Sequence, residues 1–183
     1  MATIVELDGV RPTIGEDVFL APTAVLVGDV RIADRVNIWF GTVLRGDVSH
    51  IEIGAGCSIQ DTAVIHCASE LPTVIGKNVV VGHGAMLEGC TIEDGALIGM
   101  GAIVLQRATI GAGAMIAAGA VVPEREHIAP GVLAAGVPAH VKKELSGSAL
   151  AWTGRAAAHY QELRETYLRA SRMHAADHVR VPN

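Results

Sequence analysis

Aliphatic residues recur at every sixth position along most of the chain, and we call these residues the anchors. The interval is lengthened by three residues at the segment RGDVSH, broken again at CASELPTV, and shortened by one residue before Ile92. A small or β-branched residue follows most anchors by four positions, and Gly or Ala often follows directly. The anchors are Ile14, Leu20, Leu26, Ile32, Ile38, Leu44, Ile53, Ile59, Ile65, Ile75, Val81, Leu87, Ile92, Ile98, Val104, Ile110, Ile116 and Val122.

A period of six is too long for a helix, which repeats every 3.6 residues. It fits short strands joined by tight bends, with three strands in a coil of about 18 residues. The anchors and small residues would fill the bore, and glycine would suit the corners because it adopts positive φ freely. We therefore predict an all-β solenoid, a parallel β-helix of hexapeptide repeats. Six coils would run from Ile14 to Val122, and IAPGVLAAGVPAHV would close a seventh. The period does not set the handedness.

The pattern changes beyond Pro138. The segment SGSALAWTGRAAAHYQELRETYLRASRM is rich in alanine and places larger side chains at helical spacings, so it predicts an amphipathic helix capped by Ser146 or Ser148. We expect this helix to pack along the prism of its own chain or of a neighbouring copy. The chain is thus divided into a hexapeptide-repeat β-helix over residues 1–141 and a C-terminal α-helix with a polar tail over residues 142–183.

Composition narrows the function classes. The 183 residues are 50% hydrophobic but only 3% aromatic, and the net charge is −5. We expect no nucleic-acid and no membrane partner, because basic residues form no block and no apolar run approaches the roughly 20 residues that span a bilayer. Three cysteines without a CxxC motif argue against a disulfide framework. The sequence therefore predicts a cytoplasmic protein.

Large polar residues gather in the middle three coils, at positions where other coils carry small residues. The residue after the third anchor of each coil belongs to one column, spaced by about 4.8 Å. His66 and Glu88 are therefore expected to be neighbours, with Arg45 on the other side of His66. A second column places Asp61 beside His83. The first column reads Val27, Arg45, His66, Glu88 and Leu105.

His83 cannot join His66 and Glu88 within one chain. It precedes Glu88 by five residues, which is on the order of 15 Å along the coil. A second copy could bring its own His83 to that position. Because a prism with three equal faces suits a three-fold assembly, we predict a homotrimer with a metal site at each subunit interface.

Each candidate residue also has a structural alternative. Arg45 and Asp47 could form a surface ion pair worth at most about 1 kcal/mol. Gln60 and Asp61 could be corner hydrogen-bonding residues, and Cys67 has no activating base that the sequence reveals, which favours packing. Other histidines are expected to be solvated: His50, His127, His140, His159, His174 and His178.

The segments NIWFGTVLRGDVSHIEIGAGCSIQDTAVIHC and PTVIGKNVVVGHGAMLEGC resemble the γ-class carbonic anhydrases and their relatives, which are left-handed β-helix trimers. The C-terminal GVPAHVKKEL and HYQEL resemble the phenylacetate-pathway thioesterase and carnitine-operon branches of that family. The resemblance covers nearly the whole chain. The run RGD, QD, IH and VGH is more specific than a bare hexapeptide repeat.

The resemblance implies a zinc ion, or Fe(II) or Co(II), held by two histidines of one subunit and one of the next. The matching metal positions are His66, His83 and Glu88. The resemblance also implies supporting catalytic roles: Arg45, Asp47, Gln60 and Asp61 match residues that organise the interface and bond the metal-bound solvent, and Tyr160 matches a helix tyrosine that reaches the pocket in some relatives.

Glu88 is a departure, because the family usually has histidine at this position. Two histidines and a carboxylate form a workable set for zinc and also suit Fe(II). A carboxylate donates negative charge, so a bound water should ionise at higher pH than on three histidines. The alternative is that Glu88 binds no metal and the site is degenerate.

The function that these residues favour is hydration of CO2 by a carbonic anhydrase-like lyase, weakened by Glu88. Three alternatives stay open: an acyl-CoA thioesterase on the same site, a metal-free hexapeptide acyltransferase with a histidine as general base, and a non-catalytic trimeric scaffold. The expected substrate is a small molecule, either CO2 or bicarbonate or an acyl-CoA.

Overall fold

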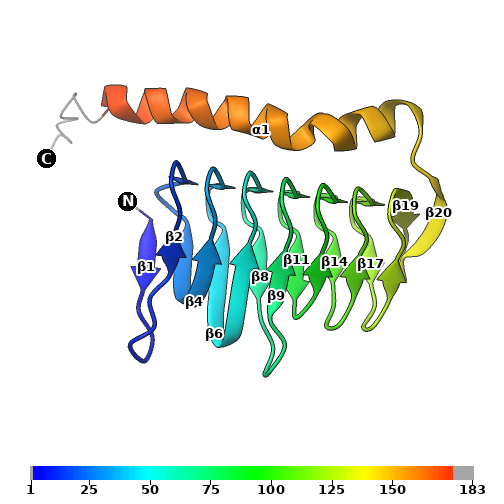
Figure 1. Cartoon of the computed structure of the whole chain (residues 1–183), viewed down its shortest axis with the longest axis horizontal. Coiled ribbons are helices and arrows are strands. Elements are labelled where there is room, and N and C mark those ends of the chain that lie inside the picture. Colours follow the sequence, from blue (N-terminus) through cyan, green and yellow to red (C-terminus); the bar gives the residue numbers. More distant parts are fainter. Residues whose placement is uncertain (1, 175–183) are drawn as a thin grey trace, which may run out of the picture.

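The computed structural model describes residues 2–174, which form a prism of stacked coils with one long helix beside it (Figure 1). The prism has about seven turns, and strands of neighbouring coils pair in parallel, as the six-residue period predicts. The final pair is the exception, because β20 (His140–Glu144) runs antiparallel to β19 (Val132–Ala135). β20 continues past residue 141, where the sequence analysis divided the chain. The predicted polar tail begins at His174, which is the last residue of the long helix, and residues 175–183 lie outside the described residues.

One face of the prism is a sheet that carries the helix, and we call it the helix face. Its strands follow the order β20-β19-β16-β13-β10-β7-β5-β3. Their bounds are β3 Phe19–Leu20, β5 Asn37–Ile38, β7 Ser58–Ile59, β10 Val80–Val81, β13 Leu97–Ile98 and β16 Met115–Ile116, followed by β19 and β20 as given above.

The other two faces belong to one sheet, because two long strands continue around an edge of the prism. These strands are β4 (Val25–Ile32) and β6 (Val43–Ile53). The first part of β6 pairs with β8 (Val64–His66), whereas its second part pairs with β9 (Thr73–Ile75). The extra residues of the RGDVSH segment therefore lie at this edge, within a strand.

The first of these faces is named the aliphatic face after its outward side chains. Besides the first parts of β4 and β6 and strand β8, it contains β1 (Thr3–Val5), β11 (Met86–Glu88), β14 (Ile103–Val104) and β17 (Val121–Val122). Its outward positions are aliphatic in six successive coils, and at Val64 and Met86 the side chains are 37% and 52% exposed. The outward row is Val25, Val43, Val64, Met86, Ile103 and Val121.

The remaining face is the polar face. Its outward residues are mostly hydrophilic, and Val74 is the exception. Besides the second parts of β4 and β6 and strand β9, it contains β2 (Thr13–Ile14), β12 (Thr91–Ile92), β15 (Thr109–Ile110) and β18 (His127–Ile128). The outward row is Thr13, Arg31, Glu52, Val74, Thr91, Thr109 and His127.

The anchors fill the bore, which confirms the main prediction from the period. Leu26, Leu44 and Ile65 are each fully buried, and burying such a side chain contributes roughly 1.5–3 kcal/mol. The prediction is wrong for Ile14, which is 39% exposed. Ile14 lies in the first coil of the prism, where no earlier coil covers the bore.

The reason given for the corner glycines is also wrong at the positions that follow the anchors. Gly54 does not have positive φ; instead, a Cβ there would lie 2.5 Å from the backbone oxygen of Gly76 in the next coil. Positive φ occurs later in the corners, for example at Gly84, where φ is 67°. Where glycine follows an anchor, as at Gly54, it is therefore required because the coils stack too closely for a side chain.

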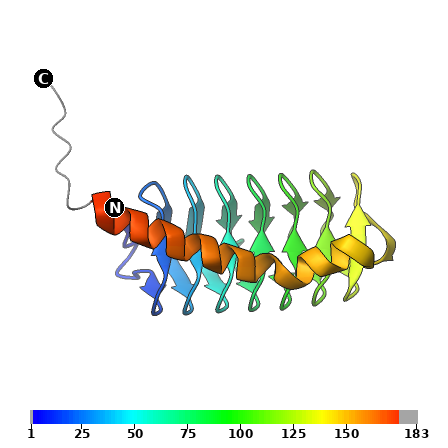
Figure 2. The same cartoon turned by 90° about the horizontal axis from the view of Figure 1, so that it is seen from above.

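Helix α1 (Gly147–His174) returns along the helix face of its own chain, from the last coil toward the first (Figures 1 and 2). It begins directly after Ser146, one of the two residues predicted to cap it. The Gln161 amide donates to the backbone oxygens of Arg35 and Gly56 at 2.8 and 3.0 Å. Tyr160 and Tyr167 pack on the ring of Trp39. Within residues 2–174, no helix has the length and apolar character needed to cross a bilayer.

Candidate metal centre

The predicted polar column lies at one edge of the aliphatic face. Strand pairing places Val27 beside Arg45, Arg45 beside His66, and His66 beside Glu88. In successive coils, these residues lie where β4, β6, β8 and β11 reach the edge of the aliphatic face. The expected adjacency of His66 and Glu88 is therefore confirmed.

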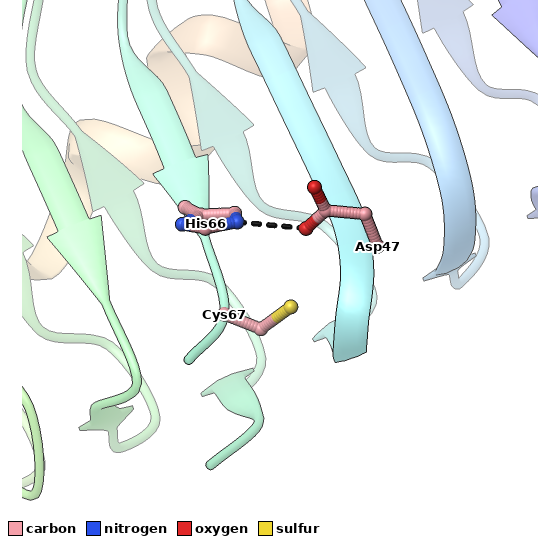
Figure 3. A group of neighbouring side chains, drawn as sticks. All are labelled: Asp47, His66 and Cys67. Carbon is pink, nitrogen blue, oxygen red and sulfur yellow. Dashed lines mark hydrogen bonds and ion pairs between the residues drawn. The ribbon is translucent and has the colours of Figure 1, made fainter. Parts of the chain in front are cut away.

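His66 is held between two carboxylates. Its Nε2 lies 2.8 Å from Oδ1 of Asp47 (Figure 3). Its Nδ1 lies 3.7 Å from Oε1 of Glu88. Because an ionised carboxylate only accepts hydrogen bonds, the proton of a neutral imidazole is on Nε2. The lone pair of Nδ1 then faces a carboxylate oxygen, and a cation or a proton between them would make that arrangement favourable.

Asp47 stays ionised in this setting. Burial tends to raise the pKa of its carboxyl, but hydrogen bonds from His66 and Arg45 outweigh burial and lower the pKa below its ordinary value. Arg45 also forms an ion pair with Asp47, as the sequence allowed. Gly46 between them has no room for a side chain, since a Cβ there would lie 2.3 Å from the backbone oxygen of Asp29. The tight backbone at this edge thus fixes the carboxylate against His66.

Cys67 belongs to the same cluster, which the sequence analysis did not expect. Potential ligand atoms of Asp47, His66 and Cys67 all lie within 4.8 Å of one another (Figure 3). The Cys67 side chain is buried, however, and its Sγ lies 3.7 Å from the backbone oxygen of Arg45. Its burial and that contact agree with the packing role expected for it.

Gln106 is a further polar residue that sequence reasoning missed. Its Nε2 donates to Oε1 of Glu88 at 3.3 Å. Gln106 follows Glu88 by 18 residues, which is one coil, so the period carried a signal that could have found it.

The second group lies at the opposite edge of the aliphatic face, where the chain turns from the helix face. Nδ1 of His83 lies 2.8 Å from Oδ2 of Asp61, which confirms that these residues are neighbours. The other oxygen of Asp61 accepts the Phe40 backbone N–H at 3.0 Å. The His83 backbone N–H donates to Oε1 of the buried Gln60 at 3.1 Å. His83 is thus oriented by two residues of the preceding coil.

A cavity of about 230 Å³ opens beside His83, between the helix face and α1. Its walls are mainly apolar, with Val80, Leu97 and Trp152 among them, and its polar lining comes from Gln60, His83 and Tyr160. Burial, together with the negative charge of Asp61, raises the pKa of Tyr160. Tyr160 therefore stays a neutral hydrogen-bond donor well into the alkaline range.

The structure thus divides the predicted site residues into two groups. Arg45, Asp47, His66 and Glu88 form one, and Gln60, Asp61, His83 and Tyr160 form the other. Within the described part of the chain, the compact cluster of potential ligands around His66 does not include His83.

Both histidines nevertheless share one feature of metal ligands. Each has one ring nitrogen 2.8 Å from an aspartate oxygen, as a hydrogen bond at His66 and as an ion-pair contact at His83, and its second ring nitrogen does not contact that aspartate. Metal-bound histidines almost always have such a partner. Ligands of a tetrahedral zinc ion lie roughly 3.3 Å apart when the bonds are 2.0–2.1 Å long. The 3.7 Å between His66 and Glu88 is close to that separation, so these residues fit a metal ion.

Comparison with known proteins identifies the family. The family description "Bacterial transferase hexapeptide (six repeats)" matches residues 11–46 and 89–124. A "Probable carbonic anhydrase" of Methanocaldococcus jannaschii is 48% identical over 153 residues, which covers 84% of this chain and 96% of that protein. The chain belongs to the γ-class carbonic anhydrase-like family. The predicted left-handed β-helix of hexapeptide repeats is thereby confirmed.

Two further relatives extend this family assignment. The chain is 47% identical over 109 residues to "Gamma carbonic anhydrase 2, mitochondrial" of Arabidopsis thaliana, covering 56% of this chain and only 39% of that protein. Among solved structures, a putative acetyltransferase of Bacillus cereus has a TM-score of 0.88 at 38% identity, covering 91% of this chain and 96% of that one. The family thus includes proteins whose names point to different reactions.

Proposed function

We propose that the protein is a γ-carbonic anhydrase-like lyase that hydrates CO2 at a metal site shared between copies of a homotrimer. Zinc, or Fe(II) or Co(II), would be bound by His66 and Glu88 of one copy and by the partner subunit's His83. The observation that carries this proposal is the pair of aspartate-supported histidines at the two edges of one face.

The aliphatic face supplies the reason for assembly. Its outward row is apolar in six coils and lies between the two halves of the site, whereas the helix face is covered by α1 and the polar face suits water. A continuous row of aliphatic side chains that are partly or fully exposed is typical of an interaction surface. Packing this face against a neighbour would bring His66 and Glu88 of one copy toward the partner subunit's His83.

When bound, the metal supplies a Lewis acid that makes water a nucleophile near neutral pH. Asp47 and Asp61 hold the ring nitrogens of His66 and His83, and Arg45 keeps Asp47 charged. Gln60 accepts the His83 backbone N–H through its oxygen, which leaves its amide hydrogens for a substrate oxygen in the cavity. Tyr160 donates from the far wall. The negative charge of Glu88 would reduce the Lewis acidity of the bound metal, so hydration of CO2 should be slower than with three histidine ligands.

Metal analysis combined with CO2 hydration tests the proposal. We expect close to one zinc, iron or cobalt ion per chain in the purified protein, and loss of both metal and activity after treatment with a chelator. Glu88→His should raise CO2 turnover by about tenfold or more. Trimeric protein that hydrates CO2 without metal would contradict the proposal, as would metal bound equally well by His66→Ala.

Hydrolysis of a thioester or ester at the same site is a second candidate, and the cavity favours it. Its volume of about 230 Å³ is far larger than CO2 requires and approaches the roughly 300 Å³ of small-ligand pockets. Leu97→Trp would fill the cavity, which His66 and Glu88 do not line. If an acyl group binds there, this variant should lose thioester hydrolysis by about tenfold and keep its metal. If the wild type and Leu97→Trp hydrolyse short and branched acyl thioesters equally well, thioester hydrolysis in this cavity is ruled out.

A further inference from the structure

We infer that Gln106 positions Glu88 as a metal ligand and withdraws charge from its carboxylate. The inference rests on the proposed function, because it takes Glu88 to be a ligand. Gln106 is a positioning residue in this account, since it acts through Glu88 and contacts neither metal nor substrate.

The geometry assigns this role to one oxygen. Oε1 of Glu88 accepts the Gln106 amide at 3.3 Å, and the same oxygen is the one that lies 3.7 Å from Nδ1 of His66. The two neighbours belong to the coils on either side of Glu88. Gln106 therefore holds Oε1 toward the free nitrogen of His66, where a shared cation would lie.

Among the described residues, no other hydrogen bond competes for the Gln106 side chain. Within residues 2–174, its side chain has Glu88 as its hydrogen-bond partner, and it lies half-buried after β14. The Glu88 side chain is 41% exposed, so without a donor it could adopt several rotamers in water. Fixing it beforehand would reduce the entropy lost when a cation binds.

The chemistry of the donor matters as much as its position. A lysine or arginine at this position would neutralise Glu88 and repel the cation. An amide instead donates a hydrogen bond to the ligand oxygen without adding charge. That bond draws electron density away from the metal. It should therefore restore part of the Lewis acidity that the metal loses when one of its ligands is a carboxylate. Gln106 would thus make a glutamate workable where three histidines are usual.

A double-mutant cycle on the full-length protein tests this inference with Co(II) as the probe. Gln106→Met keeps the size of the side chain but removes the donor. We expect it to weaken Co(II) binding by about 10-fold to 100-fold, measured by competition with a chelator. In a Glu88→His background the same substitution should change binding less than about twofold, since the carboxylate is gone. The visible spectrum of bound Co(II) should change with Gln106→Met in the wild-type background alone.

Glu124→Met is the matched control, because Glu124 lies in the same corner one coil beyond Gln106 and is exposed. It should leave Co(II) binding unchanged. An equal effect of Gln106→Met in both backgrounds would overturn the inference, and so would no effect in either. Gln106→Leu provides a second variant if Gln106→Met does not assemble, and the oligomeric state is checked for each.

Failure of the proposed function gives a different result. If Glu88→Ala binds Co(II) as tightly as the wild type, then Glu88 is not a ligand and both proposals fall. If Glu88→Ala weakens binding but Gln106→Met does not, the ligand set stands and the role of Gln106 is wrong.

Discussion

The aliphatic face and the polar face are built from the same repeat and enclose the same bore, but their outward rows differ. Val64 and Met86 on one face occupy positions equivalent to Glu52 and Thr91 on the other. The inward anchors are aliphatic on both faces, so the difference has no bearing on how the coils stack. It teaches that the bore specifies the fold, while the outward residues decide which face meets a partner and where polar chemistry lies.

Placing charge on the aliphatic face should have the largest effect. We expect the double substitution Val64→Asp and Met86→Asp to convert a trimer into monomers, because a charge buried without a partner costs several kcal/mol. Metal should be lost together with assembly. Light scattering after size-exclusion chromatography measures the mass, and metal analysis is made on the same fractions.

Val74→Asp is the control for this comparison, since it places the same charge on the polar face. It should leave both the mass and the metal content unchanged. A variant of the aliphatic face that remains fully assembled would show that the two faces do not differ as proposed.

Mixing two inactive variants tests whether the edges of the aliphatic face belong to one shared site. His66→Ala and His83→Ala should each bind metal at least about 100-fold more weakly than the wild type. In a mixed trimer, one interface pairs an intact His66 with an intact partner His83. Co-refolded mixtures should therefore regain part of the metal and of the activity. Activity that stays absent in mixtures of confirmed composition would mean that each site lies within one chain.

A smaller effect is expected from the ion pair at the edge of the aliphatic face. In the folded protein, hydrogen bonds from His66 and Arg45 lower the pKa of Asp47 below its ordinary value. This carboxylate therefore stabilises the fold fully above that value, and the contribution is lost as the pH falls through the lower, folded value. Asp47→Asn should cost at most about 1 kcal/mol at neutral pH, because the group is near the surface.

Urea unfolding of metal-free wild type and Asp47→Asn, followed from pH 7 downward, measures that difference. The two proteins should converge in acid. A difference that grows as the pH falls would reverse the expected sign.

The period predicted much of the site because register in a solenoid follows from counting residues. It placed Glu88 next to His66 and Asp61 next to His83 without any knowledge of side-chain conformation. It could not show which oxygen of Asp47 meets His66, since that depends on a tight backbone at Gly46. Nor could it locate the cavity, because the path of α1 across the helix face depends on the packing of Tyr160 against Trp39, which a count of residues does not give. Whether His83 meets the other residues across an interface stays a prediction.

The return of α1 along the prism bears on how the molecule folds. Coils in a solenoid touch only their neighbours, so unfolding can begin at either end and spread. Here Arg164 donates to the backbone oxygen of Asp17, a contact between residues 147 positions apart, and Gln161 reaches Arg35 across 126. Helix α1 thus contacts the first coil of the prism, where Ile14 is 39% exposed. Fraying of that coil is therefore coupled to release of the helix, which makes an otherwise one-dimensional stack cooperative from end to end.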